Sequence, residues 1–595
     1  MNIHYLRKSF QFVWNISPLW FLASIFIRVV TGLFPLATLW VTKELVNAVV
    51  LIISADEPNY QRAFLFLTLE LFLVGLSSTL KHISDIFDEQ IEVKLDYSVG
   101  KLVSEKAASV PLSYYEIPEF YNHQERISGN YGNKLMSPVK NILDLGQFSI
   151  SLLSYLSFLL SFHWGLAILS AISAVPILLL QSRFGNEKFF LLKHQTQKAR
   201  ESNYFNFLLQ NRQSAKEVRL FHLGPFFLER WGKLFLSNSN EVLALLKKEK
   251  KVQMVLDLFT ALLYSLSAAI VIWLLKKKNL GVGEFVSIGQ AIKGAQASLN
   301  MMASYLAKIY EENLYIEDLF EFLDFRDEEF AFENNERIHS FPEKLKKGIT
   351  IHNVSYHYPE SKKTVINNIS FSIAPGEKIA IVGDNGSGKT TLVKCLLGLY
   401  PVSHGEILVD GININYFDPI TLKKSMTGIF QDFMQLPFSI KHNITLGDVE
   451  NMEDTVLMRK VTKQSGLLDT VQQFPNQFDT RLGKLLGDGE DLSGGQWQKL
   501  ALSRALFSKA NIILLDEPTA SLDPLTELNI FNQFKELTQD KTTIYISHRM
   551  AAARLADRIL VMKDGELVEV GNHEELLARR KNYYEMFTSQ AQWYA

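Results

Sequence analysis

The sequence predicts two parts in one chain: an α-helical membrane domain with six spans, followed by an α/β domain. Six apolar stretches precede position 310, each close to the roughly 20 residues that cross a bilayer as a helix. A glycine-rich loop at 383–390 lies between an apolar run and a helical pattern, which indicates an α/β fold. The composition agrees, because 47% hydrophobic residues with 41 phenylalanines is rich for a soluble chain of 595 residues.

The boundaries follow from the change in composition along the chain. We expect a transmembrane domain with long helices at 1–325, a linker at 326–347 and a nucleotide-binding cassette at 348–595. The apolar stretches lie at 18–42, 62–81, 142–162, 164–182, 253–275 and 283–305. The third and fourth meet at His163-Trp164, which predicts a tight hairpin.

Two long segments between the spans, 82–141 and 183–252, have helical periodicity and exceed the length of ordinary loops. They predict extensions of the membrane helices beyond the bilayer. The second extension is strongly basic, which favours the cytoplasmic side of a membrane. An even number of spans then places both termini on that side, although the basic run 276–278 becomes an exception to the rule.

The sixth apolar stretch carries polar residues at steps of three and four, which places them along one helical face. Polar side chains facing lipid are costly, so this face should look into a water-filled cavity or onto protein. Packing against a second copy of the chain is the alternative explanation. The residues are Ser287, Gln290, Lys293, Gln296, Asn300 and Ser304, with Lys293 near mid-membrane.

Two more ionisable residues, Arg28 and Glu70, lie inside predicted spans. Their expected depths differ by about 9 Å at 1.5 Å per residue, so we do not expect a direct ion pair. Both remain candidates for lining the same cavity as Lys293.

A phosphate-binding loop is predicted between Gly383 and Thr390, where the sequence fits G-x-x-x-x-G-K-[ST] after the apolar run 378–382. Glycines let the backbone N–H groups curl around phosphates, and the following helix start adds partial positive charge. Lys389 would reach the β- and γ-phosphates, and Thr390 would ligate Mg²⁺. The residues expected to bind the nucleotide here are Gly383, Asn385, Gly386, Ser387, Gly388, Lys389, Thr390 and Thr391.

A second motif is the apolar run 512–515, which ends in Asp516 and Glu517. It predicts a buried strand that delivers two carboxylates to its C-terminal edge, where open α/β sheets bind ligands. Asp516 would hold Mg²⁺, and Glu517 would polarise the attacking water as general base.

A third motif, Ser493-Gly494-Gly495-Gln496, precedes a predicted helix and again offers backbone donors to an anion. Its spacing, about 20 residues before Asp516, resembles the signature motif of ATP-binding cassette (ABC) proteins.

The resemblance extends to further motifs in the same order. Tyr358 resembles the aromatic residue that stacks on adenine, and Gln431 resembles the Q-loop glutamine near Mg²⁺. Residues 520–523 resemble the D-loop, and His548 resembles the switch histidine that contacts the γ-phosphate. The resemblance implies that Glu517 and His548 are catalytic.

The family arrangement implies a dimer in which two cassettes enclose two ATP molecules head to tail. The signature residues Ser493, Gly494, Gly495 and Gln496 then serve the partner's nucleotide, whereas the other site residues serve the chain's own. No key position is degenerate, so a homodimer is the simplest assembly.

Six spans, two long extensions and a C-terminal cassette resemble half of an ABC exporter. This implies ATP and Mg²⁺ as cofactors, export by alternating access, and a bacterial plasma membrane with the cassette in the cytoplasm. The turns near 117–122 and 214–221 would dock on cassettes. The polar face around Lys293 becomes the expected substrate path.

Three features bear on the cargo: the segment 112–121, the glycine-containing stretch 482–489, and Trp497. Together they resemble peptide exporters of lantibiotic type from Gram-positive bacteria, without a peptidase domain before the first span. An amphipathic cargo, with a peptide favoured, is therefore expected. A multidrug or lipid exporter or flippase is the alternative. An ATP-gated channel or sensor is disfavoured, because a gate needs nucleotide binding more than the turnover that Glu517 and His548 imply.

Composition and termini exclude other classes. A net charge of −2 argues against nucleic-acid binding. The single cysteine, Cys395, rules out an internal disulfide framework and is expected to be a buried apolar residue. The N-terminal sequence lacks a cleavable signal pattern, so the first apolar stretch is expected to act as an uncleaved anchor.

Overall fold

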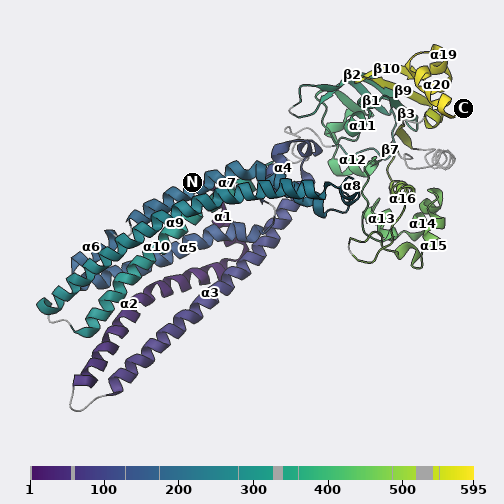
Figure 1. The fold of residues 1–595 in the computed structure, drawn as a ribbon. Helices are drawn as coiled ribbons and strands as arrows, with labels where there is room; N and C mark the ends of the chain where they lie inside the picture. The colour runs from purple at the N-terminus through teal and green to yellow at the C-terminus, as the bar shows by residue number, and fades with distance from the viewer. Residues whose placement is uncertain are drawn as a thin grey trace. The chain divides into compact units, whose positions relative to one another are not determined.

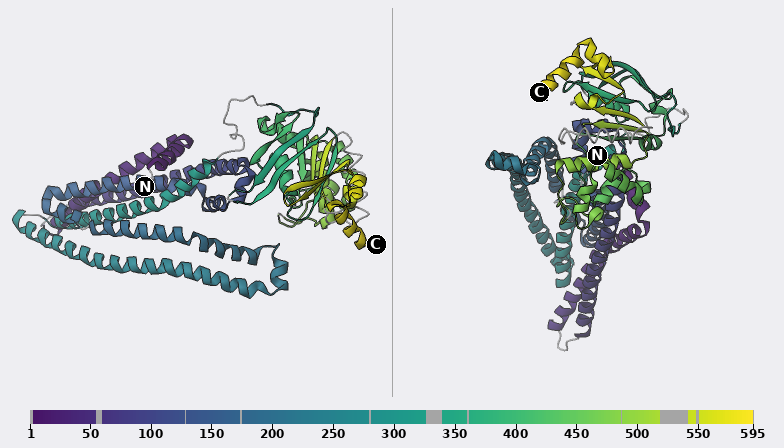
Figure 2. Two further views of the ribbon diagram at one scale, coloured as in Figure 1. Left: turned by 90° about the horizontal axis from the view of Figure 1, so that it is seen from above. Right: turned by 90° about the vertical axis from the view of Figure 1, so that its right-hand side faces the viewer.

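The computed structural model describes residues 3–54, 60–127, 129–172, 175–278, 281–325, 339–359, 361–485, 487–517, 541–547 and 550–594. The chain forms two compact units. One comprises Met1–Ala107 and Asn122–Asp324, and the other comprises Ala108–Tyr121 and Phe325–Ala595. The second unit therefore contains the cassette together with a short segment from within the helical half. Figures 1 and 2 show the fold of each unit.

The first unit consists of long helices that run side by side (Figures 1 and 2). Within this unit α10 packs along α5 and α2, and α7 packs along α9. The described helices that lie wholly or partly in this unit are α1 (Ile3–Ile16), α2 (Pro18–Ser54), α3 (Tyr60–Ser109), α4 (Pro118–Ile127), α5 (Tyr131–Phe162), α6 (Trp164–Ile172), α7 (Val175–Gln210), α8 (Ala215–Leu220), α9 (Leu223–Lys278) and α10 (Val282–Leu323).

Four helices in the described part of the chain are long and apolar enough to cross a membrane. They are Pro18–Ile53, Tyr60–Ser109, Tyr131–Phe162 and Leu223–Trp273, which contain the predicted spans 1, 2, 3 and nearly all of 5. The predicted fourth span falls on α6 and the start of α7, with 173–174 outside the described residues. The predicted sixth span falls on α10, where the polar residues dilute the apolar ones. Spans four and six therefore stay predictions.

The predicted hairpin at His163 is confirmed. Helix α5 ends at Phe162, and α6 begins at Trp164. Phe158 and Leu159 of α5 share a buried cluster with Leu166 of α6, so the chain folds back on itself there.

The predicted extensions are also helical. Helix α3 continues without interruption from the second apolar stretch to Ser109, and α9 begins at Leu223, well before the fifth. The buried residues of α3 recur at steps of three and four, so its second half has one packed face. That face consists of Ser84, Asp88, Ile91, Leu95, Val99 and Val103.

The described part of the cassette contains two sheets. The six-stranded sheet has the order β10-β9-β3-β8-β7-β6, and all its strands are parallel except β10. These strands are β3 (Lys378–Gly383), β6 (Met426–Ile429), β7 (Ile512–Asp516), β8 (Thr542–Ile546), β9 (Arg558–Lys563) and β10 (Glu566–Gly571). Every residue of β3, β7 and β8 is buried, as expected for parallel strands covered on both faces. The predicted strands before the phosphate loop and before Asp516 are confirmed.

The second sheet is antiparallel, with the order β2-β1-β4-β5. Its strands are β1 (Ile349–His357), β2 (Thr364–Ile373), β4 (His404–Val409) and β5 (Ile412–Asn413). One buried cluster joins both sheets to α11 (Lys389–Leu396), through residues such as Val354, Ile381 and Leu392. Cys395 belongs to this cluster, which confirms its predicted burial. Burial raises the pKa of its thiol to about 12.

Helices α13 (Ile440–Thr445), α14 (Thr455–Gln464), α15 (Leu468–Gln473) and α16 (Gly494–Phe507) gather at one end of the cassette (Figure 1). They share a separate buried cluster that includes Trp497. The other α-helices in the described part of the cassette are α12 (Pro419–Ser425), α18 (Met550–Ala553), α19 (His573–Arg579) and α20 (Asn582–Tyr594).

Candidate nucleotide-binding site and membrane path

The phosphate loop lies between β3 and α11 and depends on glycine at both ends. Gly383 has φ +154° and Gly388 has φ +95°, values that other residues rarely adopt. A Cβ on Gly383 would lie 2.1 Å from the carbonyl oxygen of Met562, and one on Gly388 would lie 2.8 Å from that of Val365. The loop therefore has the tight curl that directs backbone N–H groups toward an anion.

The Lys389 side chain folds back over this loop. Its ammonium donates hydrogen bonds to the carbonyl oxygens of Gly383, at 2.9 Å, and Asp384, at 2.7 Å. Burial lowers the pKa of Lys389, and the nearby carboxylates of Glu517 and Asp516 oppose that shift. A desolvated ammonium held beside a curled backbone is suited to a polyphosphate.

The other loop residues divide by exposure. Asn385 and Gly386 are exposed, whereas Ser387 and Thr391 are buried. The Ser387 hydroxyl lies 3.5 Å from the ammonium of Lys389. The middle of the loop is therefore open to solvent, whereas Ser387 and Thr391 are packed inside the cassette.

Thr390 and Asp516 meet across the sheet edge. The Thr390 hydroxyl donates to a carboxylate oxygen of Asp516 at 2.8 Å, and Asp516 is only 5% exposed. A hydroxyl oxygen and a carboxylate oxygen side by side are the hard ligands that Mg²⁺ prefers, so the residues present fit this ion.

Glu517 has a strained backbone. Its φ is +48°, in the left-handed region that costs a residue with a Cβ about 1 kcal/mol or more. The Glu517 N–H donates to the carbonyl oxygen of Ile546 at 3.1 Å. The side-chain amide of Gln498 donates to the carbonyl oxygen of Glu517, also at 3.1 Å. These bonds from β8 and α16 hold the unusual conformation. Sequence reasoning missed Gln498, whose only signal is its position two residues after the signature glutamine.

The parallel sheet explains why residues far apart in sequence converge. Strand β8 lies between β3 and β7, and the carboxyl ends of all three strands meet at one edge. Gln431 is exposed and lies two residues beyond β6, which ends at the same edge. His548 and the D-loop stretch 520–523 lie outside the described residues.

The signature residues form a helix start. Ser493 is the N-cap of α16: its hydroxyl accepts a hydrogen bond from the Gln496 N–H, and its own N–H donates to the Gln496 side chain at 2.8 Å. This reciprocal capping box fixes the direction of the helix start. Ser493 and Gly494 are exposed, and Gly495 and Gln496 are half-buried, so this end is accessible to a second cassette.

Tyr358 is half-buried and anchored at its hydroxyl, which lies 3.2 Å from the hydroxyl of Thr391. Its ring packs edge-on against Tyr356 and Tyr400, with centroids 5.4 and 5.8 Å away. The predicted adenine-stacking residue therefore contacts the first turn of α11 directly.

In the first unit, α10 carries most of the predicted polar face as an exposed strip. Gln290, Lys293 and Asn300 are exposed, whereas Gln296 and Ser304 are half-buried at its margin. Ser287 does not belong to the strip, because it is fully buried and its hydroxyl bonds to the Glu284 carbonyl of the same helix.

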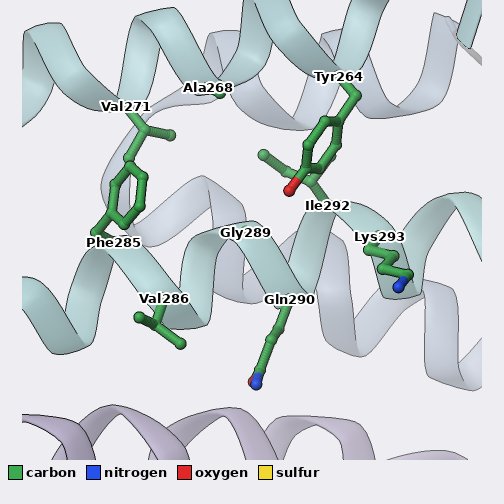
Figure 3. Close-up of a pocket in the computed structure, with 9 residues that line it drawn as sticks. All are labelled: Tyr264, Ala268, Val271, Phe285, Val286, Gly289, Gln290, Ile292 and Lys293. Carbon is green, nitrogen blue, oxygen red and sulfur yellow. The ribbon is translucent and has the colours of Figure 1, made fainter. Parts of the chain in front are cut away.

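A cavity of about 250 Å³ lies between α9 and α10 beside this strip (Figure 3). Figure 3 shows Tyr264 reaching from α9 toward α10, while Gln290 points away from α9. The lining residues are Tyr264, Ala268 and Val271 of α9 and Phe285, Val286, Gly289, Gln290, Ile292 and Lys293 of α10.

Arg28 and Glu70 do not lie on this strip. Arg28 is 5% exposed, and its guanidinium pairs with Asp88 and Asp144, both at 2.7 Å. Glu70 accepts a hydrogen bond of 3.1 Å from the Thr42 hydroxyl. The expectation that Arg28 lines an open cavity is therefore not supported, because its charge is neutralised inside the helix packing.

The comparisons with known proteins agree with this geometry. The family described as ABC transporter matches residues 366–520. The subtilin transport ATP-binding protein SpaT of Bacillus subtilis is 32% identical over 98% of this chain and 94% of its own length. The nisin transport ATP-binding protein NisT of Lactococcus lactis subsp. lactis is 33% identical over 98% and 96%. A bacterial Atm1-family ABC exporter with ATP bound has a similar fold, with a TM-score of 0.80 over 97% of this chain and 99% of that one at 21% identity.

Proposed function

The chain belongs to the ABC transporter family and has the exporter fold, and we propose that two copies of it export an amphipathic peptide at the expense of ATP. The observation that carries this proposal is the cassette edge, where a phosphate loop, Asp516 and a strained Glu517 come together. Full-length similarity to two peptide transport proteins supports the cargo class.

Each residue at the cassette edge has a proposed role in hydrolysis. Lys389 would bind the β- and γ-phosphates, and Thr390, Asp516 and Gln431 would hold Mg²⁺, which would supply positive charge against the phosphates. Glu517 accepts a proton from the attacking water, and its strained backbone aims the carboxylate. His548 contacts the γ-phosphate, and Tyr358 stacks on the adenine.

We propose a homodimer because the signature residues need a partner's nucleotide. The start of α16 is exposed at Ser493 and Gly494, and its capping box keeps the N–H groups of the first turn oriented for an anion. A second copy would present its phosphate loop there. Each nucleotide site would then be complete only in the dimer, with the phosphate loop from one chain and the signature from the other.

The proposed substrate path runs along the exposed strip of α10. Lys293 is exposed and makes no ion pair among the described residues. If α10 spans the membrane, as the sequence predicts, this charge is costly unless it faces water or an anionic group. The cavity beside it is mainly apolar, with Tyr264 and Phe285 as aromatic walls. Apolar walls beside a cation suit an amphipathic cargo with an acidic group.

The proposed location is a bacterial plasma membrane, with the cassette in the cytoplasm. The four long apolar helices support a location in a membrane. The basic extension 183–252 supports the orientation in which the cassette faces the cytoplasm. ATP supply also requires the cassette to face the cytoplasm.

Transport into sealed vesicles tests the proposal. Inside-out vesicles containing the full-length chain should accumulate a labelled amphipathic peptide, such as a precursor encoded beside this gene, only with Mg²⁺ and ATP. Glu517→Gln vesicles provide the matched control and should show no accumulation. ATP-dependent transport of lipid or drug probes with no peptide uptake would contradict the peptide cargo. Ion flux without ATP turnover would contradict export altogether.

A further inference from the structure

Tyr400 of the cassette is hydrogen-bonded to a residue from the helical half of the sequence. Its hydroxyl donates to a carboxylate oxygen of Glu116 at 2.6 Å, although the two residues are 284 positions apart. Both belong to the same compact unit. Tyr400 is 1% exposed, whereas Glu116 is exposed, so the bond links the interior of the cassette to the segment at its surface.

The Tyr400 hydroxyl keeps its proton over the physiological pH range. Burial, together with the carboxylate of Glu116, raises the pKa of Tyr400 far above its ordinary value. The phenol is therefore a hydrogen-bond donor for the Glu116 carboxylate. Lys394 strengthens the arrangement, because its ammonium lies 3.3 Å from the Tyr400 hydroxyl and 5.0 Å from the centre of the ring.

The ring of Tyr400 also contacts Tyr358, the residue assigned to adenine. Tyr358 packs edge-on against it, with centroids 5.8 Å apart and an angle of 79° between the ring planes. Tyr356 stacks on the same ring in parallel, at 5.3 Å and 2°. A base stacked on Tyr358 would therefore contact a ring that packs against Tyr400, and the Tyr400 hydroxyl is bonded to Glu116.

Other residues of the segment 108–121 also pack on the cassette unit. The 3₁₀ turn η1 (Leu112–Glu116) lies between the end of α3 and the start of α4. Leu112 packs on the same buried cluster as Tyr400. Tyr114 and Phe120 both pack against Phe325, at 5.2 and 5.7 Å. The segment is continuous with α3 at its start and contains the first turn of α4.

We propose that Tyr400 is a positioning residue that transmits adenine binding at Tyr358 to the segment 108–121 through its hydrogen bond to Glu116. The proposal rests on the adenine role of Tyr358, but it does not depend on what the protein exports. When a nucleotide with a base is bound, the segment 108–121, which lies outside the nucleotide site, should open to solvent less often.

Hydrogen exchange on the full-length protein in lipid nanodiscs tests this proposal. A Glu517→Gln background prevents hydrolysis while the amides of 108–121 are followed with and without Mg²⁺ and ATP. ATP should slow their exchange by roughly 5-fold or more, the range in which two coupled sites commonly influence each other. Tyr400→Phe should reduce the slowing to less than about 2-fold. The phosphate-loop amides 383–391 should still be protected, which shows that ATP is bound.

Tyr356→Phe is a matched control, because it removes a hydroxyl from the adjacent stacked ring. The Tyr356 hydroxyl is buried and has no hydrogen-bond partner in the described structure. This variant should therefore keep the full ATP response in 108–121. Inorganic tripolyphosphate is the second control, since it lacks a base. It should protect the phosphate loop without slowing exchange in 108–121.

Glu116→Ala removes the same hydrogen bond by deleting its exposed acceptor. If Tyr400→Phe does not fold, this variant replaces it in the test. It should abolish the ATP response, and Glu116→Gln, which keeps an acceptor, should restore part of it. A full ATP response in both Tyr400→Phe and Glu116→Ala would overturn the proposal. Equal protection of 108–121 by tripolyphosphate and by ATP in the unmodified chain would overturn it as well.

Discussion

The Thr390 hydroxyl donates a 2.8 Å hydrogen bond to Asp516, and this bond joins the first turn of α11 to the end of β7. Strand β8 separates β3 from β7 in the sheet, so the bond connects two motifs across an intervening strand. Both oxygen atoms are thereby placed side by side before nucleotide arrives. Ordering the ligands in advance lowers the entropic cost of binding an ion.

Thr390→Val should weaken Mg²⁺ binding because it keeps the branched shape but removes the oxygen that we propose as a ligand. The Mg²⁺ concentration that gives half-maximal ATPase activity should rise roughly 10- to 100-fold. A Mg²⁺ titration of ATP hydrolysis measures this. Thr390→Ser retains the hydroxyl and serves as the control, with a near-normal titration. An unchanged Mg²⁺ dependence in Thr390→Val would remove Thr390 from the ligand set.

Glu517→Gln should separate binding from hydrolysis. The amide preserves the shape of the side chain but cannot accept a proton from water, so kcat should fall by about 10²- to 10⁴-fold. The affinity for ATP should change little. Steady-state ATPase and equilibrium nucleotide binding measure the two effects. Glu566→Gln changes a carboxylate of β10 that accepts a hydrogen bond from Asn367 of β2, and it should leave both unchanged. Residual turnover near the normal rate would assign the base elsewhere.

The ion cluster around Arg28 should be sensitive to the loss of one partner. Asp88→Asn leaves a buried guanidinium poorly compensated, which should destabilise the helical unit by about 3–5 kcal/mol. Thermal unfolding in mild detergent, followed by tryptophan fluorescence, would show this as a lowered midpoint. The control is Asp85→Asn, whose side chain is half exposed and 3.8 Å from Lys140. Equal midpoints for the two variants would mean that the buried pair adds no stability.

Sequence reasoning identified the cassette strands and the phosphate loop because their signals are local. The strand, the glycines and the helix start follow one another within about 20 residues, so the pattern specifies both the fold and the chemistry. The burial of Cys395 was predictable for the same reason, since it lies on the apolar face of the next helix.

The contacts that sequence reasoning missed join distant segments. Arg28 bonds to Asp88 and Asp144, 60 and 116 positions away, and no spacing rule connects them. The bond between Tyr400 and Glu116 is of the same kind. Ser287 was expected on the exposed polar face but is buried. It lies at the edge of that face, and packing against neighbouring helices, which helical spacing does not reveal, decides which edge residues are covered.

Cys395 should be inert toward thiol reagents in the folded protein. Its side chain is 1% exposed and its pKa is raised to about 12, so the reactive thiolate is scarce below pH 9. Mass spectrometry after treatment with N-ethylmaleimide should show no adduct at pH 7 or pH 8.5, and one adduct after denaturation. In a Cys395→Ala background, Leu485→Cys at an 82% exposed position should react readily. Fast labelling of native Cys395 would contradict the packing described for α11.

The signature at Ser493–Gln496 should act on the partner's nucleotide, and mixed dimers can test this directly. Lys389→Ala disables a phosphate loop, and Gly494→Asp places a negative charge where the signature would meet phosphate. If the signature acts in trans, a dimer with one lesion in each chain keeps one intact site. A dimer with both lesions in one chain and none in the other keeps no intact site.

Two affinity tags allow each mixed dimer to be purified away from the parental dimers. The split-lesion dimer should retain up to about half of the normal ATPase activity if the two sites act independently, because one of two symmetric sites survives. The double-lesion dimer should retain almost none. The two dimers carry the same substitutions, so each controls for the general damage that the substitutions cause. The reverse order of activities would place the signature in cis, and it would also remove the reason for expecting that the chain works only as a pair.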